Sequence, residues 1–236
     1  FIDPARIPMA GLCLHLGGRL VSKRLAKWMS TRVREIIRVA PDDSRLDPDL
    51  SVHTRIRAGV ESFVTGILPL LTPVEADPEF SACFESFERR VGDLLAPLWD
   101  PAPGAALTEI DAVRVARGLL GGEADVFVGN SLPVRIFDSL HGCVPSPHTR
   151  WFCNRGASGI DGNLATLAGI AATAPAGRRV LGFVGDLTAL HDLNSLVLLA
   201  RSPAPIVLFV LNNDGGGIFS HLPVRSQSAL LDRFVT

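Results

Sequence analysis

The sequence lacks a charge excess, a long hydrophobic run and a closely spaced cysteine motif. Its 236 residues carry 23 lysines and arginines against 24 aspartates and glutamates, so the formal net charge is −1. This balance does not favour binding to nucleic acid or to an anionic membrane surface. Each apolar run is far shorter than the roughly 20 residues that a membrane-spanning helix needs. The sequence therefore predicts neither a nucleic-acid partner nor a membrane span.

The four cysteines, Cys13, Cys83, Cys143 and Cys153, are widely separated and form no CxxC pair. A zinc site is therefore not expected. An even number would permit two disulfides, but free thiols in a reducing compartment are the expectation for a chain of this length. The apolar fraction of 47% argues against disorder.

The first hundred residues contain alternating strand and helix patterns. Strands are predicted at 12–16, 34–40 and 51–58, and helices at 22–30 and from residue 80 onward, where apolar residues recur at helical spacing. A Pro/Gly segment at 100–105 predicts a domain boundary. We therefore expect a first domain at 1–99 and a second at 100–236.

The alternation becomes regular after this boundary. Strands are predicted at 125–129, 179–186 and 205–211, and helices at 107–120, 133–140, 160–174 and 190–200. Strands that are apolar throughout and separated by helices are typical of a parallel sheet covered on both faces. The predicted fold class is α/β, with parallel sheets flanked by helices in two domains.

Polar residues follow two of the predicted strands. Asp186 closes RVLGFVGD, and Asn213 follows PIVLFVL as part of NNDGGGIF. Both side chains are expected at the carboxyl ends of neighbouring parallel strands, where open α/β sheets bind ligands. Carboxylate, amide and glycine carbonyl oxygens suit Mg²⁺, and a helix expected after Leu187 would offer its N-terminus to a phosphate.

Two other interpretations of these residues are available. NNDGGG taken alone favours a plain turn over a ligand site. A dinucleotide-binding Rossmann site is poorly supported, because no GxGxxG motif follows a predicted strand.

Four segments in order carry a family resemblance. They are GNSLPVR (129–135), NRGASGIDG (154–162), GDLTALHDLN (185–194) and NNDGGGIF (212–219). Together they resemble the MenD family of thiamin-diphosphate (ThDP) enzymes, the 2-succinyl-5-enolpyruvyl-6-hydroxy-3-cyclohexene-1-carboxylate synthases of menaquinone and phylloquinone biosynthesis. LGGRLVSKRL (16–25) is similar to a segment of the family's middle domain. Leu187 departs from the wider ThDP pattern, in which a glycine usually follows the aspartate.

The resemblance implies a transferase that uses ThDP with Mg²⁺ or Mn²⁺. It implies that 2-oxoglutarate loses carbon dioxide and is added to isochorismate. The residues that match the metal ligands are Asp186, Asn213 and Gly215, the last through its carbonyl. Gly185 and Leu187 match neighbouring cofactor-binding positions. Ile160 matches the apolar residue that lies between the two rings of the cofactor. The residues that match the catalytic and substrate site are Ser131, Arg135, Arg155 and Lys23, and an apolar wall of Ile218, Phe219 and Leu222.

The resemblance also implies parts beyond these segments. The family carries a pyrimidine-binding domain with an activating glutamate, expected here from a second subunit of a homo-oligomer. The chain is accordingly expected to be a fragment, with an incomplete middle domain and a diphosphate-binding domain truncated at its C-terminal end, and to be inactive alone. A cytoplasmic location is expected, or a plastid one in a photosynthetic eukaryote.

Two alternatives stay open. One is another ThDP-dependent 2-oxoacid decarboxylase or synthase, although Arg135 and Arg155 favour a second anionic substrate. The other is a non-catalytic, cofactor-binding half that needs a partner chain, although the intact Asp186 and Asn213 argue against it.

Overall fold

A computed structural model describes most of the chain: residues 6–18, 20, 22–43, 47, 49–73, 75, 77–99, 104–120, 122–140, 148–156, 158–222 and 226. Cys143 and part of the predicted 100–105 linker lie outside these ranges. The chain divides into two compact units, Phe1–Pro97 and Leu98–Thr236, each of which is described by itself. The assignment of the units to a middle and a diphosphate-binding domain stays a prediction.

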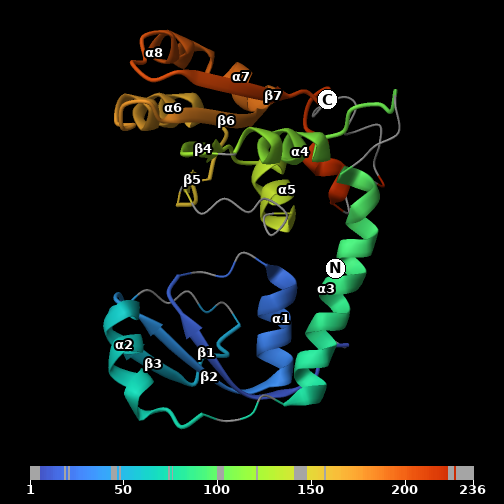
Figure 1. The fold of residues 1–236 in the computed structure, drawn as a ribbon, viewed down its shortest axis with the longest axis vertical. Coiled ribbons are helices and arrows are strands. Elements are labelled where there is room, and N and C mark those ends of the chain that lie inside the picture. Colours follow the sequence, from blue (N-terminus) through green and yellow to red (C-terminus); the bar gives the residue numbers. More distant parts are fainter. Residues whose placement is uncertain are drawn as a thin grey trace. The chain divides into compact units, whose positions relative to one another are not determined.

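The first unit contains a three-stranded parallel sheet in the order β1-β2-β3 (Figure 1). Its elements are β1 (Ala10–Leu16), α1 (Lys23–Arg32), β2 (Val33–Ala40), β3 (Thr54–Arg57), α2 (Val60–Ile67), η1 (Leu68–Leu70) and α3 (Pro78–Trp99), whose last two residues fall in the second unit. Ser22 caps α1 by accepting a hydrogen bond from the Leu25 N–H at 3.2 Å, the expected role for serine at this position. Trp28 and Ile36 lie in its core, and Phe80 and Phe87 of α3 pack against them.

The second unit contains a four-stranded parallel sheet in the order β5-β4-β6-β7. Its strands are β4 (Ala124–Val128), β5 (Thr149–Phe152), β6 (Arg179–Gly185) and β7 (Ile206–Leu211). Its helices are α4 (Ile110–Leu119), α5 (Leu132–Leu140), α6 (Asn163–Ala172), α7 (Asp186–His191), η3 (Leu193–Ser195), α8 (Leu196–Ala200) and η4 (Gly217–His221). The predicted α/β class with parallel sheets flanked by helices is confirmed.

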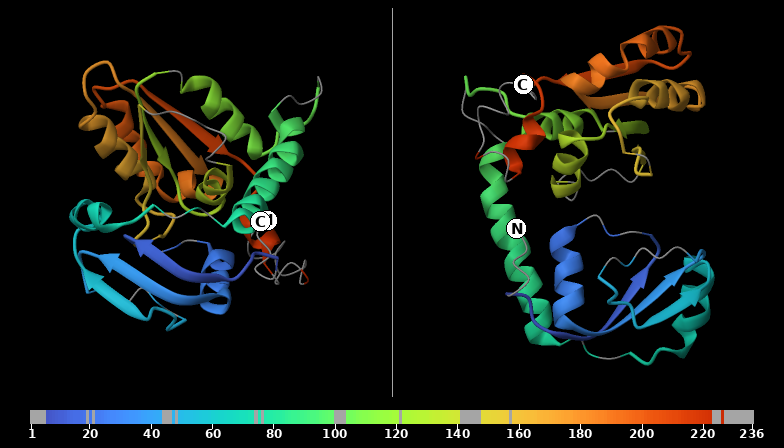
Figure 2. Two further views of the ribbon diagram at one scale, coloured as in Figure 1. Left: turned by 60° about the horizontal axis from the view of Figure 1, so that its bottom comes forward. Right: turned by 180° about the vertical axis from the view of Figure 1, so that it is seen from behind.

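Helices cover both faces of this second sheet. The views in Figures 1 and 2 place α6 and α8 on one face and α4 and α5 on the other. Alternate residues of β6 serve the two layers, because successive strand side chains point to opposite faces. Val180 and Val184 pack in the cluster that contains Leu164 of α6, whereas the Phe183 ring lies 4.9 Å from that of Phe137 in α5.

Several sequence expectations were wrong in detail. The strand β5 and the helix α2 were not predicted. The helix expected at 190–200 is interrupted at Asp192 because this carboxylate caps another helix, accepting hydrogen bonds from the Leu164 and Ala165 N–H groups of α6 at 2.6 and 3.0 Å. The helix expected after Leu187 begins at Asp186.

The cover over β7 is also thinner than predicted. Val207 and Val210 of this strand each retain 48% of their exposure, because β7 stands last in the sheet order formed by the described residues. None of the helices in the described part of the chain is both long and apolar enough to cross a membrane.

Candidate active site

The predicted metal ligands lie at one edge of the second sheet. In the parallel pair of β6 and β7, Gly185 is in register with Leu211. Asp186 follows the first strand directly, and Asn213 comes two residues after the second. Both residues therefore stand at the carboxyl ends of neighbouring strands, as the spacing of 27 residues predicts for a single strand–helix–strand crossover.

Asp186 is hydrogen-bonded to the loop that follows β7. Its Oδ2 accepts a hydrogen bond from the Gly215 N–H at 2.8 Å, and its Oδ1 accepts one from the Leu187 N–H at 2.9 Å. The φ angle of Gly215 is +113°, a conformation that favours glycine because it has no Cβ. The glycine therefore lets the loop turn close against the carboxylate.

Asn213 is held from two sides. Its Nδ2 donates a hydrogen bond to Glu109 Oε1 at 2.8 Å, across 104 residues of sequence, and its Oδ1 accepts a long contact of 3.4 Å from the Gly217 N–H. A Cβ added to Gly217 would lie 2.7 Å from Asn213 Cγ, closer than real contacts allow. Gly217 must therefore lack a side chain for Asn213 to keep this position.

Two non-glycine residues in the candidate loops adopt positive φ angles. They are Ser131, at +73° after β4, and Asp214, at +59° after β7. Such backbone conformations are unfavourable for residues with a Cβ and tend to occur at functional sites. Ser131 was predicted to be an active-site residue. Its positive φ angle is a second, independent indication that the loop after β4 has a functional role.

A buried amide joins the two arginine-bearing segments. Asn130 is buried, and its Nδ2 donates a hydrogen bond to the Gly159 carbonyl at 2.6 Å. Its N–H donates to Asn163 Oδ1 at 3.2 Å, and its Oδ1 accepts from Arg155 Nη1 at 3.3 Å. The loops that follow β4 and β5 are thereby tied together at the carboxyl edge.

Arg135 has a different setting. Its guanidinium donates to the Ser131 carbonyl one helical turn earlier, and its side chain is exposed. This bond helps to hold the Ser131 loop. The described contacts thus place Ser131 and Arg135 together, and Arg155 beside Asn130 in the adjoining loop.

Comparison with known proteins identifies a family model and several relatives that match this chain. A family model described as the C-terminal thiamine pyrophosphate-binding domain of thiamine pyrophosphate enzymes matches residues 140–231. Three relatives carry the name 2-succinyl-5-enolpyruvyl-6-hydroxy-3-cyclohexene-1-carboxylate synthase. They come from Psychromonas ingrahamii (34% identity, covering 94% of this chain and 36% of the relative), Shewanella loihica (37%, 94% and 37%) and Halorhodospira halophila (38%, 94% and 38%).

The chain belongs to this synthase family. It spans a little more than a third of the length of the curated relatives that it matches. The resemblance predicted from the four motifs is confirmed at the level of the family.

The edge residues fit the metal and diphosphate that this synthase family implies. The candidate donors are a carboxylate (Asp186), an amide oxygen (Asn213) and the carbonyl of Gly215, and such hard oxygen ligands suit Mg²⁺ or Mn²⁺. No group of three or more His, Cys, Asp or Glu side chains that could hold a metal occurs among the described residues. A donor set of mixed side-chain and backbone oxygens is consistent with that finding.

The remaining predicted residues fall into three places. Ile160 is half-buried in the loop before α6, and Ile218 and Phe219 lie in η4 with Leu222 just after it. Phe219 and Leu222 are exposed. Lys23 is the exposed first residue of α1 in the other unit, so its role stays a prediction.

Some residues of the site were not predicted. Asn130 and Asn163 lie within or beside the quoted motifs, but only their burial and hydrogen bonds indicate their function. Glu109 gave no signal in the sequence, because its partner Asn213 is 104 residues away. Gly217 could have been suspected from the run of three glycines after a strand.

Proposed function

We propose that this chain contributes the diphosphate-binding part of a ThDP- and Mg²⁺-dependent synthase that adds 2-oxoglutarate, with loss of carbon dioxide, to isochorismate. The single observation that carries the proposal is the placement of Asp186, Gly215 and Asn213 at the carboxyl ends of two neighbouring strands. The name shared by the relatives supports the choice of reaction.

In this proposal the metal is held by Asp186, Asn213 and the Gly215 carbonyl. When bound, ThDP supplies a carbon nucleophile that the protein itself lacks. The glycines near β7 let the backbone approach the diphosphate. The hydrogen bond between Asp186 and the Gly215 N–H fixes the two ligand-bearing segments to each other before any ligand binds, which lowers the cost of ordering the site.

The substrates in this proposal are carboxylates, and the arginines would bind them. The planar guanidinium group of Arg155 can form two parallel hydrogen bonds to a carboxylate. Asn130 Oδ1 accepts from one of its nitrogens and would aim the rest of the group. Ser131 and Arg135 would line the same pocket, with Ile160, Ile218, Phe219 and Leu222 excluding water from the reacting carbon.

The metal assignment is tested by Asp186→Ala in a protein extended to the full length of its relatives. Mg²⁺-dependent binding of ThDP should be lost in isothermal titration, because the diphosphate then lacks the cation that compensates its charge. Asp138→Ala, which changes an exposed carboxylate on α5, is the matched control and should bind normally. Unchanged cofactor affinity in the Asp186 variant would remove this residue from the metal site.

A further inference from the structure

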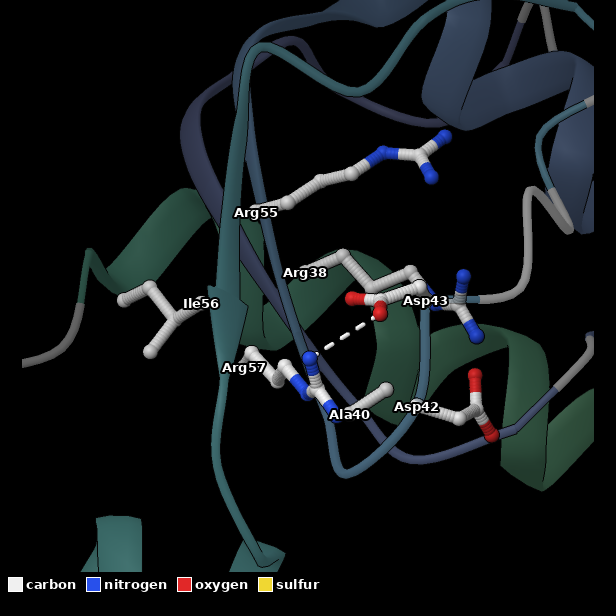
Figure 3. A pocket seen from close by; sticks show the side chains of 7 residues that line it. All are labelled: Arg38, Ala40, Asp42, Asp43, Arg55, Ile56 and Arg57. Carbon is white, nitrogen blue, oxygen red and sulfur yellow. Dashed lines mark ion pairs between the residues drawn. The ribbon is translucent and has the colours of Figure 1, made fainter.

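A pocket of the first unit is lined by charged side chains that have partners (Figure 3). The lining residues are Arg38, Ala40, Asp42, Asp43, Arg55, Ile56 and Arg57. Arg57 Nη1 lies 3.0 Å from Asp43 Oδ2, the ion pair that the figure marks with a dashed line. Arg38, Asp42 and Arg55 each have an interaction partner as well. These charges therefore give no reason to expect a ligand there, and the residue that bears most directly on ligand binding lies in the second unit.

That residue is Glu109, which lies outside the four sequence motifs. It is half-buried beside the start of α4, and its Oε1 accepts the hydrogen bond from Asn213 Nδ2 at 2.8 Å. Another carboxylate caps this helix, since Asp111 Oδ2 accepts hydrogen bonds from the Thr108 N–H at 2.6 Å and the Thr108 hydroxyl at 3.0 Å. Within the described part of the chain, Glu109 makes no capping hydrogen bond. Its carboxylate is therefore directed at Asn213.

This hydrogen bond decides which end of the Asn213 amide faces the loop after β7. An ionised carboxylate only accepts hydrogen bonds, so the amide turns its Nδ2 toward Glu109. Its Oδ1 then faces the Gly217 N–H at 3.4 Å, and the same N–H donates to the Gly215 carbonyl at 2.7 Å. The two candidate ligand oxygens of this loop thus converge on one backbone N–H.

The opposite orientation of the amide would be unfit for a cation. Turning the amide by half a rotation exchanges the oxygen for an NH₂ group, whose protons repel a metal ion. The close approach of Gly217, where an added Cβ would lie 2.7 Å from Asn213 Cγ, confines the amide but does not distinguish its two ends, because they are similar in size. The hydrogen bond to Glu109 supplies that distinction.

We propose that Glu109 is a positioning residue of the metal site, which holds Asn213 Nδ2 so that Oδ1 is presented to the divalent cation. This inference rests on the proposed function, in which Asn213 is a metal ligand. Groups that orient the ligands of a metal typically contribute a factor of about 10 to 100 in metal affinity. Without Glu109 the amide populates both orientations, and binding of the cation must first select one of them.

The test measures Mn²⁺ binding, in the presence of ThDP, by the protein extended to the full length of its relatives. Electron paramagnetic resonance of the free ion gives the dissociation constant without any need for turnover. Glu109→Ala should raise this constant about 10- to 100-fold. Glu109→Met, which keeps most of the side-chain length without the acceptor, should do the same and guards against a loss of folding in Glu109→Ala. Glu109→Gln should stay within about threefold of the unchanged protein, because its amide oxygen accepts the same hydrogen bond.

The matched control is Glu61→Ala, which removes an exposed carboxylate from the first turn of α2 in the first unit and should leave Mn²⁺ binding unchanged. The inference alone is overturned if Glu109→Ala and Glu109→Met bind Mn²⁺ as tightly as the unchanged protein while Asp186→Ala does not. Equal losses in Glu109→Gln and Glu109→Ala would also overturn it, because Glu109 would then act through its charge. If the unchanged protein binds no Mn²⁺, the proposed function fails and this inference fails with it.

Discussion

Asn130 is the residue on which the candidate substrate loops converge. It is buried and joins three segments, through Asn163, Gly159 and Arg155. A buried amide with its polar groups satisfied stabilises one arrangement of its neighbours, because any other arrangement leaves a donor or acceptor without a partner. Arg155 is exposed, but its guanidinium group is oriented by its hydrogen bond to the buried Asn130.

The role of Arg155 can be separated from that of the cofactor site. In the full-length enzyme, Arg155→Lys keeps the positive charge but loses the planar fork. We expect kcat/KM for the carboxylate substrates to fall about 10- to 100-fold, which corresponds to about 1.4–2.7 kcal/mol, the scale of one charged hydrogen bond. ThDP affinity, measured by titration, should barely change.

Arg201→Lys, at an exposed position after α8, is the control for this experiment and should behave as the unchanged enzyme. The opposite pattern, with normal substrate kinetics and lost ThDP binding, would move Arg155 from the substrates to the cofactor phosphate.

At the scale of elements, an ion cluster around a buried aspartate joins the strands at the edge opposite to the candidate active site. Asp125 of β4 is fully buried and accepts hydrogen bonds from Arg150 Nε of β5 at 2.7 Å and from Arg178 Nε, just before β6, at 2.6 Å. Arg178 also donates to the Ala124 and His148 carbonyls. The three strands are thus joined at their N-terminal ends. This helps to hold their carboxyl ends, which form the candidate site, in one arrangement.

This cluster predicts a pH-dependent stability. Burial raises the pKa of the Asp125 carboxyl, but hydrogen bonds and charge from Arg150 and Arg178 outweigh burial and leave the pKa below its ordinary value. A lowered pKa in the folded state stabilises the protein above the unfolded pKa of about 3.9, and this contribution is lost as the pH falls below it. Asp125→Asn should therefore lower the free energy of unfolding by about 3–5 kcal/mol at pH 7.

Urea unfolding of both proteins at pH 7 and at about pH 3.5 measures this effect. The difference in stability between them should shrink at the lower pH, because the unfolded chain then binds a proton at Asp125 that the folded protein, with its lowered pKa, does not bind. A difference that is equal at the two pH values would show that Asp125 acts through packing and not through its charge.

At the scale of the whole molecule, the chain represents a little more than a third of the length of its relatives. Its family resemblance implies that the pyrimidine end of ThDP and the activating acid belong to a further domain. We therefore predict that the purified 236-residue chain does not convert isochorismate and 2-oxoglutarate. Product formation followed by absorbance and by release of carbon dioxide checks this, with the full-length enzyme of a relative as the positive control. Turnover by the chain alone would contradict it.

The sequence by itself was sufficient for the features that depend on neighbours along the chain. Hydrophobic periodicity located most strands and helices, and the residues that follow β6 and β7 indicated which sheet edge carries Asp186 and Asn213. A single strand–helix–strand crossover connects two parallel strands in only a few ways. The spacing between Asp186 and Asn213 therefore places both residues at the same edge of the sheet. Short elements such as β5, with four residues, gave too little periodicity to be predicted.

Only the tertiary structure decided which distant groups meet. Glu109 binds Asn213 across 104 residues, and Asp192 interrupts a predicted helix because it caps α6 from 28 residues away. The register that sets Arg38 beside Arg55 depends on the pairing of β2 with β3. These contacts cannot be predicted from the local propensities of each segment. They depend on strand order and on packing, and the energies of packing outweigh the preference of any single segment.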